Sequence, residues 1–272
     1  MNGTRELELK ANEMRKLIIR MIGKASSGHP GGSLSAADVV AALYFKVMNI
    51  DPKNPNWSDR DRFVLSKGHA CPAMYAALAM KGYYPMDELD HLREFGAMLQ
   101  GHPSSRTTPG VDVSTGSLGQ GLSIANGIAL GGKLDCKDYY TFCLMGDGEI
   151  EEGQIWEAAM TAAHYKLDHV IGFVDYNHLQ IDGSIEDVIG NVRIAEKFMA
   201  FGWNVLTVNG HEIGEILNAI EKAKETKDVP TVIILNTIKG KGVSFMENLS
   251  CWHGTCPSPA QVEKSLVELE VI

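Results

Sequence analysis

The chain has 272 residues, 44% of them hydrophobic and 22% charged, with a net charge of −9 at pH 7. This length suits one large α/β domain, the composition is that of a soluble globular protein, and the negative charge disfavours nucleic acid as a partner. The longest apolar runs are too short to span a membrane, residues 1–10 lack a secretory signal, and five scattered cysteines argue against a disulfide framework, so we expect a cytoplasmic protein.

The first half of the chain predicts helices separated by Gly- and Pro-rich turns. Apolar spacing predicts a helix over residues 6–24, which leads into the turn-like segment 27–33. Ser35 is expected to cap a second helix over residues 36–47. A short strand over 62–66 precedes a helix over 72–80 that has a proline at its start, and a further short helix is expected over 87–95.

The second half alternates strands with helices. The glycine-rich segment 116–121 opens a helix that runs to about residue 134. The units that follow are strand 139–145, helix 153–165, strand 169–175, helix 193–200, strand 203–208, helix 212–226, strand 231–236 and a terminal helix 259–268. This alternation predicts a three-layer α/β/α fold with a mostly parallel, doubly wound sheet. We expect one domain over 1–272, with N-terminal helices in 6–47 and a loop and helix in 239–272 at its other end.

A carboxylate and an amide follow two of these strands. Asp147 lies in the run Gly146-Asp147-Gly148 directly after strand 139–145, and Asn177 comes shortly after strand 169–175. Ligands of open α/β sheets bind at the carboxyl edge, where these residues would meet. Their oxygens suit Mg²⁺, and the glycines allow the backbone to approach a diphosphate closely. The pattern is typical of a thiamine diphosphate site.

Four histidines lie beside glycine or proline in turn-like segments: His29, His69, His102 and His253. Each alone is most simply a loop histidine with a satisfied hydrogen bond. Four on the loops of one sheet favour a functional cluster, since imidazoles transfer protons near neutral pH and bind hydroxyls or phosphates. The other five histidines receive no role.

Three further segments carry weaker signals. Gly116 to Gly121 lacks the glycine spacing of the dinucleotide fingerprint and is either a tight turn or a set of backbone amides facing a polar ligand. The acidic residues 149, 151 and 152 open a helix, where capping explains most such clusters. Lys239 and Lys241 alternate with glycines, as in a solvated loop or in a lid that brings an ammonium to an anionic cofactor.

Seven motifs in order resemble the N-terminal, diphosphate-binding half of the transketolase family. They are Ser27-Gly28-His29-Pro30, Ser66-Lys67-Gly68-His69-Ala70, Gly101-His102-Pro103, Gly116 to Gly121, Gly146-Asp147-Gly148 with Asn177, Lys239-Gly240-Lys241-Gly242 and Trp252-His253-Gly254. They extend over nearly the whole chain, and seven in order are a specific signal.

The resemblance implies a cofactor site of thiamine diphosphate with Mg²⁺, or with Ca²⁺ or Mn²⁺ in its place. Asp147, Asn177 and the carbonyl of Leu179 correspond to metal ligands, and Gly148 and His69 to diphosphate contacts. The full set of expected cofactor contacts is His69, Gly116, Ser117, Leu118, Asp147, Gly148, Glu149, Asn177, Leu179, Lys239 and His253. Many family members carry proline where Ser117 stands.

The resemblance also implies residues that act on the substrate. His29, His102 and His253 correspond to histidines that contact donor-sugar hydroxyls and assist proton transfer. Lys67 and Lys239 are similar to active-site lysines. Glu152 resembles an acidic residue in the network that links two cofactor sites. Gly32 replaces a serine found in some relatives, so that side-chain contact is absent.

By this resemblance the chain transfers a two-carbon ketol unit from a ketose phosphate to an aldose phosphate, with the cofactor as the electron sink. Pentose phosphates are the family default. The family's pyrimidine-binding half, with its essential glutamate, does not follow within the nineteen residues after His253. We therefore expect one subunit of a split transketolase, active only with a separate C-terminal subunit, in a heterotetramer of two copies of each.

Four alternatives stay open at this point. A 1-deoxyxylulose-phosphate synthase-like half enzyme shares several of these turns, and the α subunit of a 2-oxoacid dehydrogenase shares Gly-Asp-Gly and the asparagine. A noncatalytic regulatory subunit would retain only the Mg-diphosphate pocket. A nicotinamide-binding Rossmann domain lacks its glycine fingerprint here.

Overall fold

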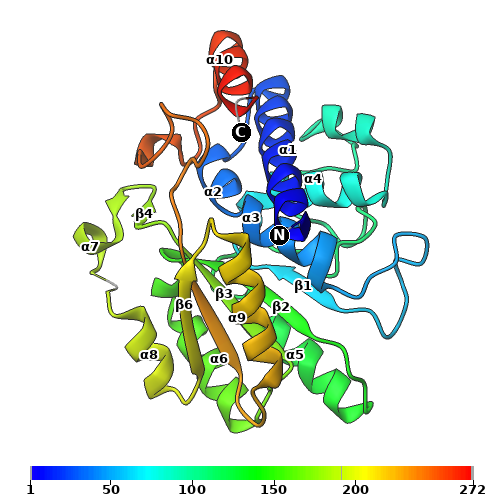
Figure 1. The fold of residues 1–272 in the computed structure, drawn as a ribbon, viewed down its shortest axis with the longest axis vertical. Coiled ribbons are helices and arrows are strands. Elements are labelled where there is room, and N and C mark those ends of the chain that lie inside the picture. The colour runs from blue at the N-terminus through cyan, green and yellow to red at the C-terminus, as the bar shows by residue number, and fades with distance from the viewer. Residues whose placement is uncertain (1, 191, 271–272) are drawn as a thin grey trace.

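The computed structural model describes residues 2–190 and 192–270 (Figure 1). The α-helices are α1 (Asn2–Ala25), α2 (Pro30–Ser35), α3 (Ala37–Ala42), α4 (Cys71–Lys81), α5 (Gly121–Leu134), α6 (Gly153–His164), α7 (Ile185–Val188), α8 (Ile194–Ala200), α9 (Ile213–Glu225) and α10 (Pro259–Leu269). The strands are β1 (Arg62–Leu65), β2 (Thr141–Gly146), β3 (Val170–Tyr176), β4 (Leu179–Gln180), β5 (Gly183–Ser184), β6 (Asn204–Asn209) and β7 (Thr231–Asn236). Short 3₁₀ or π segments are η1 (Leu43–Val47), η2 (Gly68–Ala70), η3 (Met86–His91), η4 (Glu149–Glu151) and η5 (Ser250–Trp252).

The main sheet has five strands in the order β1-β2-β3-β7-β6, and every neighbouring pair is parallel. Gly146, the last residue of β2, is in register with Asp175 near the end of β3. The carboxyl ends of the two central strands therefore finish together, and the loops after them begin at one edge. The expected mostly parallel α/β sheet is confirmed.

Both faces of this sheet are covered by helices because the strands are apolar on both sides. Phe173 belongs to the core on the side of α1, α3, α4 and α9, whereas the next residue, Val174, belongs to the core that α5, α6 and α8 close. The period of two along each strand thus divides the interior into two apolar layers. Three layers result, α/β/α (Figure 1).

Helix α1 joins the N-terminal region to the end of the chain. It packs against α3, α4 and α10, and α10 lies beside it at the top of Figure 1. The Asn12 side chain donates a hydrogen bond to the Leu269 carbonyl at 2.7 Å. Ser258 begins α10 with a capping box that Gln261 completes. Residues near both ends of the sequence therefore support the same side of the molecule.

The expected single helix over 36–47 is wrong in detail. The segment 30–47 forms two short helices, α2 and α3, followed by the π-helical turn η1. Ser35 is the last residue of α2 and does not cap the next helix, whose start has no side-chain cap. Its hydroxyl donates to the Asp175 carboxylate, so this serine is bound to the sheet edge.

Two other segments differ from expectation. The helix predicted over 87–95 is a 3₁₀ segment that ends at His91, because Arg93 and Gly96 adopt positive φ and break the run. Beyond Asn177 the chain forms an unexpected hairpin of β4 and β5 followed by the short helix α7. The remaining elements match the predicted ones within about four residues at their ends, as is usual for boundaries read from pattern alone.

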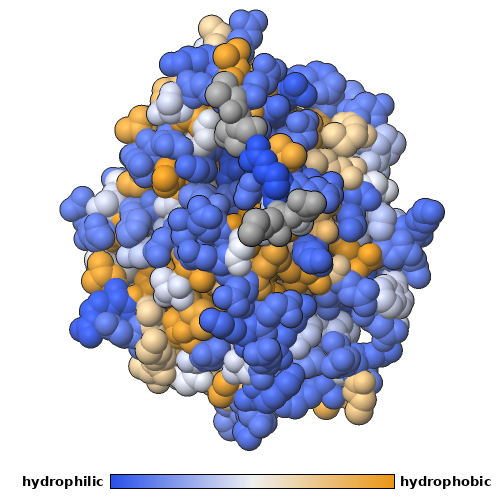
Figure 2. All heavy atoms as spheres, in the orientation of Figure 1, coloured by the Kyte–Doolittle hydropathy of each residue, from blue (hydrophilic) through white to orange (hydrophobic). Residues whose placement is uncertain are grey.

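The exterior is mostly polar on the face drawn in Figure 2, where hydrophobic groups form separate patches. None of the helices within residues 2–190 and 192–270 combines the length and hydropathy that a bilayer crossing needs. All five cysteines are free thiols, and Cys71 and Cys143 are buried.

Candidate functional site

A cavity of about 560 Å³ opens at the carboxyl edge of the sheet. Its walls come from the loops that follow β1, β2, β3 and β7, together with the segments around residues 29, 102 and 253. Of the residues expected at the site, it is lined by His29, Lys67, His69, His102, Gly116, Leu118, Asp147, Gly148, Glu149, Glu152, Asn177, Leu179, Lys239 and His253. Parallel strands thus bring together side chains that are more than 200 residues apart in the sequence.

Asp147 and Asn177 both accept hydrogen bonds from backbone N–H groups of the residues beside them. The Asp147 carboxylate accepts hydrogen bonds from the backbone N–H of Gly148 at 2.9 Å and of His178 at 2.5 Å. The Asn177 Oδ1 accepts from the N–H of Leu179 at 3.2 Å, and its Nδ2 donates to Asp175. The loops after β2 and β3 are therefore held against each other, with the amide oriented by a carboxylate behind it.

The charge balance at this point favours a bound cation. Burial and the nearby negative charge of Asp175 raise the pKa of Asp147. A metal ion would remove that penalty. No three His, Cys, Asp or Glu side chains converge as a metal cage in the described ranges. The oxygens that meet here are one carboxylate, one amide and one carbonyl, the last bound to the Lys239 ammonium. Such an incomplete oxygen set suits Mg²⁺, which completes its shell with water and phosphate oxygens.

Lys239 lies under this oxygen set. Only 2% of its surface is exposed, and its ammonium donates to the Leu179 carbonyl at 2.9 Å and lies 3.1 Å from Nδ1 of His253. Burial lowers the pKa of Lys239, while Asp147 opposes that shift. The lysine is therefore not the tip of a solvated loop, and it places a positive charge in the cavity that an anionic ligand would neutralise.

Three of the four expected histidines form a compact cluster. The ring centroid of His69 lies 5.1 Å from that of His29 and 5.0 Å from that of His253, and the centroids of His29 and His253 are 5.6 Å apart. Burial, together with neighbouring cations, lowers the pKa of His29 to about 4, of His69 to about 2 and of His253 to about 3. All three rings are therefore neutral at pH 7, each with one N–H donor and one acceptor nitrogen.

His102 lies at the exposed rim of the same cavity, and burial lowers its pKa as well. A methyl group at Gly116 would lie 3.2 Å from the His102 ring, so the glycine allows the imidazole to pack on the backbone. Ser117 is exposed and lies in an adjoining depression rather than in this cavity, and α5 begins only at Gly121.

No pattern in the sequence indicated a role for Asp175. Its carboxylate is fully buried and binds the Lys67 ammonium, the hydroxyls of Ser35 and Thr237, and the Asn177 amide. Lys67 also donates to the Gly32 carbonyl at 2.9 Å. Both Lys67 and Asp175 are thus bound to the floor of the cavity, where they position other groups.

The acidic residues after Asp147 divide into different roles. Both oxygens of the Glu149 carboxylate are engaged, by the Ser66 hydroxyl and by the N–H groups of Gly119 and Gly146, so this side chain fixes the loops around the cavity. Glu152 is exposed at the start of α6. The Oε1 atom of Glu151 is buried with no hydrogen-bond partner among the described residues. A donor on a bound molecule or a second chain would satisfy it.

Two more features were not predicted from the sequence. Gln180, Ile181, Asp182, Val188 and Ile189 line the cavity from the hairpin and α7, a segment whose pattern indicated no element. His211, which received no role, accepts from the N–H of Ile238 at 2.8 Å and lies 2.7 Å from the Asp38 carboxylate. It therefore anchors the residue before Lys239.

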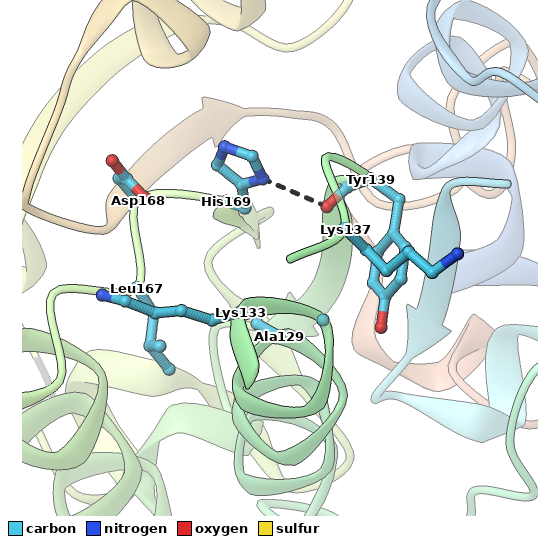
Figure 3. Close-up of a pocket in the computed structure, with 8 residues that line it drawn as sticks. Ala129, Lys133, Lys137, Tyr139, Leu167, Asp168 and His169 are labelled. Atoms are coloured by element: carbon cyan, nitrogen blue, oxygen red, sulfur yellow. Dashed lines mark hydrogen bonds between the residues drawn. The ribbon is translucent and has the colours of Figure 1, made fainter. Parts of the chain in front are cut away.

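A smaller cavity of about 110 Å³ lies at the opposite, amino edge of the sheet (Figure 3). There His169 contacts the Tyr139 carbonyl at 3.3 Å, and the Lys133 ammonium donates to the carbonyls of Tyr165 and Lys166. Its polar groups are engaged by the protein itself. The histidine-lined cavity is therefore the candidate active site.

Known proteins resemble this chain along nearly its whole length. Residues 7–267 match the family model described as "Transketolase, thiamine diphosphate binding domain". The chain is 49% identical over 265 residues to the 6-deoxy-6-sulfo-D-fructose transketolase subunit SqwG of Clostridium sp. (strain MSTE9), covering 97% of this chain and 96% of that protein. It is 43% identical to one subunit of the apulose-4-phosphate transketolase of Phocaeicola vulgatus, covering 97% and 93% respectively.

Among solved structures, the transketolase from Leishmania mexicana superimposes with a TM-score of 0.92 at 34% identity. That match covers 97% of this chain but 41% of the Leishmania chain. The chain therefore spans less than half the length of this solved relative.

Proposed function

Because the chain belongs to the transketolase family, as its thiamine diphosphate binding domain, we propose that it is the cofactor-binding subunit of a two-chain transketolase. The reaction is the transfer of a two-carbon ketol unit from a ketose phosphate to an aldose phosphate. The observation that carries the proposal is the cavity that neutral histidines line together with Asp147, Asn177 and Leu179.

The residues present fit thiamine diphosphate with a divalent metal. Asp147, Asn177 and the Leu179 carbonyl would hold the metal, with Mg²⁺ as the expected ion and Ca²⁺ or Mn²⁺ as substitutes. A side chain at Gly148 would meet the Gln180 side chain at 2.5 Å, so the glycine keeps the loop after β2 close to the β4 hairpin at the cavity wall. When bound, the cofactor supplies the electron sink for cleavage of the carbon–carbon bond.

The chain's own residues bind the sugar and handle its protons. The imidazoles of His29, His102 and His253 contact substrate hydroxyls and assist proton transfer, whereas His69 contacts the diphosphate. The buried Lys239 ammonium stabilises negative charge on the bound anion, because electrostatic attraction is stronger at a buried site than in solution. Lys67 keeps the floor of the site in place through Asp175 and Gly32.

A second chain supplies the remainder of the active site. Two relatives of nearly the same length are named as subunits, and the chain matches less than half of the Leishmania transketolase. The partner is a chain of the pyrimidine-binding type, and the assembly is a heterotetramer with two copies of each. The unpartnered Glu151 oxygen and the exposed Glu152 at the cavity mouth suit a contact with that chain.

Further parts of the proposal concern organisation and location. Residues 1–272 form one domain, with the helices of 6–47 and the loop and helix of 239–272 flanking the sheet edge that carries the site. The location is the cytoplasm, in keeping with five free thiols. Among sugar phosphates, the pentose phosphates are the default substrates.

Co-expression of the chain with a pyrimidine-type partner, followed by a ketol-transfer assay, tests the function. We expect turnover from the mixture with ketose phosphate as donor, and none from either chain alone. Pyruvate in place of the ketose distinguishes a synthase-like half enzyme. Robust transfer by the purified chain without a partner would contradict the proposal.

A further inference from the structure

The Arg93 side chain is a cation that lies beside the histidine cluster but does not line the cavity. The Arg93 guanidinium lies behind His29, with Nη2 at 3.4 Å from Nδ1 of the ring. Nη1 donates to the Ser27 hydroxyl at 2.9 Å. The arginine therefore contacts His29 and the residue two positions before it, while His29 itself lines the cavity.

The direction of this contact is fixed by the chemistry of the two groups. A guanidinium carries donors and no acceptor, so Nδ1 of His29 has to be the acceptor. The ring is neutral at pH 7, because burial and the charge of Arg93 lower the pKa of His29 to about 4. A neutral ring that accepts at Nδ1 carries its proton on Nε2. Nε2 has no hydrogen-bond partner among the described residues and remains available for a ligand.

The backbone around Arg93 is built to bring the guanidinium to this position. Arg93 has φ +66°, in the left-handed region that side chains other than glycine seldom adopt, and its N–H donates to the Leu99 carbonyl at 2.7 Å. Gly101 leaves room for the side chain, since a methyl group there would lie 2.9 Å from Cζ of Arg93. Unfavourable backbone conformations persist where the surroundings require them, and such sites are often functional.

We propose that Arg93 is a positioning residue that holds the His29 ring with its proton on Nε2, so that the imidazole presents an N–H donor to the bound sugar. The arginine acts through the histidine and does not touch substrate. The expected effect of Arg93 on turnover rests on the proposed function. The tautomer of His29, in contrast, can be measured in this chain without any turnover.

Arg93→Glu provides the sharpest test, because it replaces a donor with an acceptor. The carboxylate would accept from Nδ1–H and attract the imidazolium, whereas Arg93→Lys keeps a cationic donor. The other titratable groups that face His29 are His69, His102, His253 and Lys239, and all remain unchanged. Ring ¹⁵N spectra of the full chain report which nitrogen carries the proton, and His29→Gln assigns the signals.

We expect the Nε2–H form of His29 in the native chain and in Arg93→Lys. In Arg93→Glu the proton should move to Nδ1 and the pKa of His29 should rise by at least about one pH unit. With the partner chain present, kcat/KM should fall about tenfold or more in Arg93→Glu and recover in part in Arg93→Lys. Lys24→Glu is the matched control, since it makes the same charge change in a surface pair with Asp90 and should leave the His29 signals unchanged.

A proton on Nδ1 in the native chain would overturn the inference, as would an Arg93→Glu chain whose His29 signals match the native ones. Arg93→Met keeps the apolar stem and serves if Arg93→Glu does not fold. In that variant an unchanged His29 pKa would likewise overturn the inference. Absence of ketol transfer by the native complex would instead contradict the proposed function, and the ring spectra do not depend on it.

Discussion

The Lys67 ammonium and the Asp175 carboxylate form an ion pair buried on both sides, with side-chain exposures of 3% and 0%. The pair lies beneath the candidate active site. Its carboxylate also binds Asn177, and its ammonium also binds the carbonyl of Gly32. This one ion pair thus supports both the proposed metal ligand Asn177 and helix α2, which begins directly after His29.

Removing one partner of this pair should destabilise the fold strongly. Lys67→Met leaves the Asp175 charge buried without its cation, and the expected loss in the free energy of unfolding is about 3–5 kcal/mol. Denaturant unfolding followed by circular dichroism measures it. The double variant Lys67→Met with Asp175→Leu should recover part of the loss, because no charge is left unpaired.

Lys24→Met is the control for the ion-pair prediction. Its pair with Asp90 is exposed on both sides, and such pairs contribute about 0–1 kcal/mol. A loss in Lys67→Met no larger than in this control would contradict the importance of the buried pair.

Two glycines of α5 should respond in opposite directions to the same substitution. A methyl group at Gly121 would lie 2.7 Å from the Cα of Ser66, next to Lys67, so Gly121→Ala should destabilise the chain and disturb the cavity. A methyl group at Gly127 would have no neighbour within 4 Å outside the adjacent helix backbone, so alanine there should stabilise the helix by about 0.5–1 kcal/mol. The melting temperatures of the two variants, compared with that of the native chain, test this prediction. Equal changes in melting temperature would contradict the packing argument.

The histidine cluster should make the fold sensitive to mild acid. The pKa of His69 is lowered to about 2 in the folded chain, while the unfolded chain takes up the proton near the ordinary value of 6.5. The contribution of this neutral ring to the free energy of unfolding is fully present above pH 6.5. It decreases as the pH falls, by up to about 1.4 kcal/mol per pH unit. The pKa of Asp147 is raised in the folded chain, so the contribution of this carboxyl to the free energy of unfolding increases as the pH falls.

Comparison with His69→Gln isolates this contribution, since Asp147 is common to both chains. Unfolding free energies of the two proteins, measured from neutral pH into mild acid, should show a steeper decline in the native chain. Parallel pH profiles would indicate that His69 is not buried in its neutral form.

Loss of the oxygen ligands should abolish metal-dependent binding of the cofactor. In the complex with its partner chain, Asp147→Ala combined with Asn177→Ala should weaken thiamine diphosphate binding by more than about tenfold, and added chelator should then have no further effect. Titration calorimetry with and without Mg²⁺ provides the measurement. Unchanged, metal-independent binding by the double variant would refute the assigned ligands.

Much of the fold was predictable because its determinants are local. The apolar strands and the alternation with helices led to the parallel sheet, and the residues after β2 and β3 indicated its functional edge. The helix over 36–47 was wrong because its break at η1 and the role of Ser35 depend on contacts with the sheet. Such contacts leave no periodic signal in the sequence.

The site was predictable where motifs mark it and unpredictable where burial decides the role. His29, His69 and His253 were expected from their turn-like neighbours, and the structure places them within one cluster. Asp175 and Arg93 were not, because Asp175 is an ordinary strand residue by pattern and Arg93 lies within the helix that was wrongly predicted over 87–95. Their functions arise from the three-dimensional arrangement of charges.

The two exposed thiols lie at opposite edges of the sheet. Cys136 precedes β2 at the amino edge, beside a surface depression, whereas Cys251 is two residues before His253. After Cys251→Ser, a maleimide dye at neutral pH would attach mainly at Cys136, at the edge of the sheet opposite the candidate active site. Fluorescence anisotropy of that dye would then follow assembly with a second polypeptide in real time, while the candidate active site stays unlabelled.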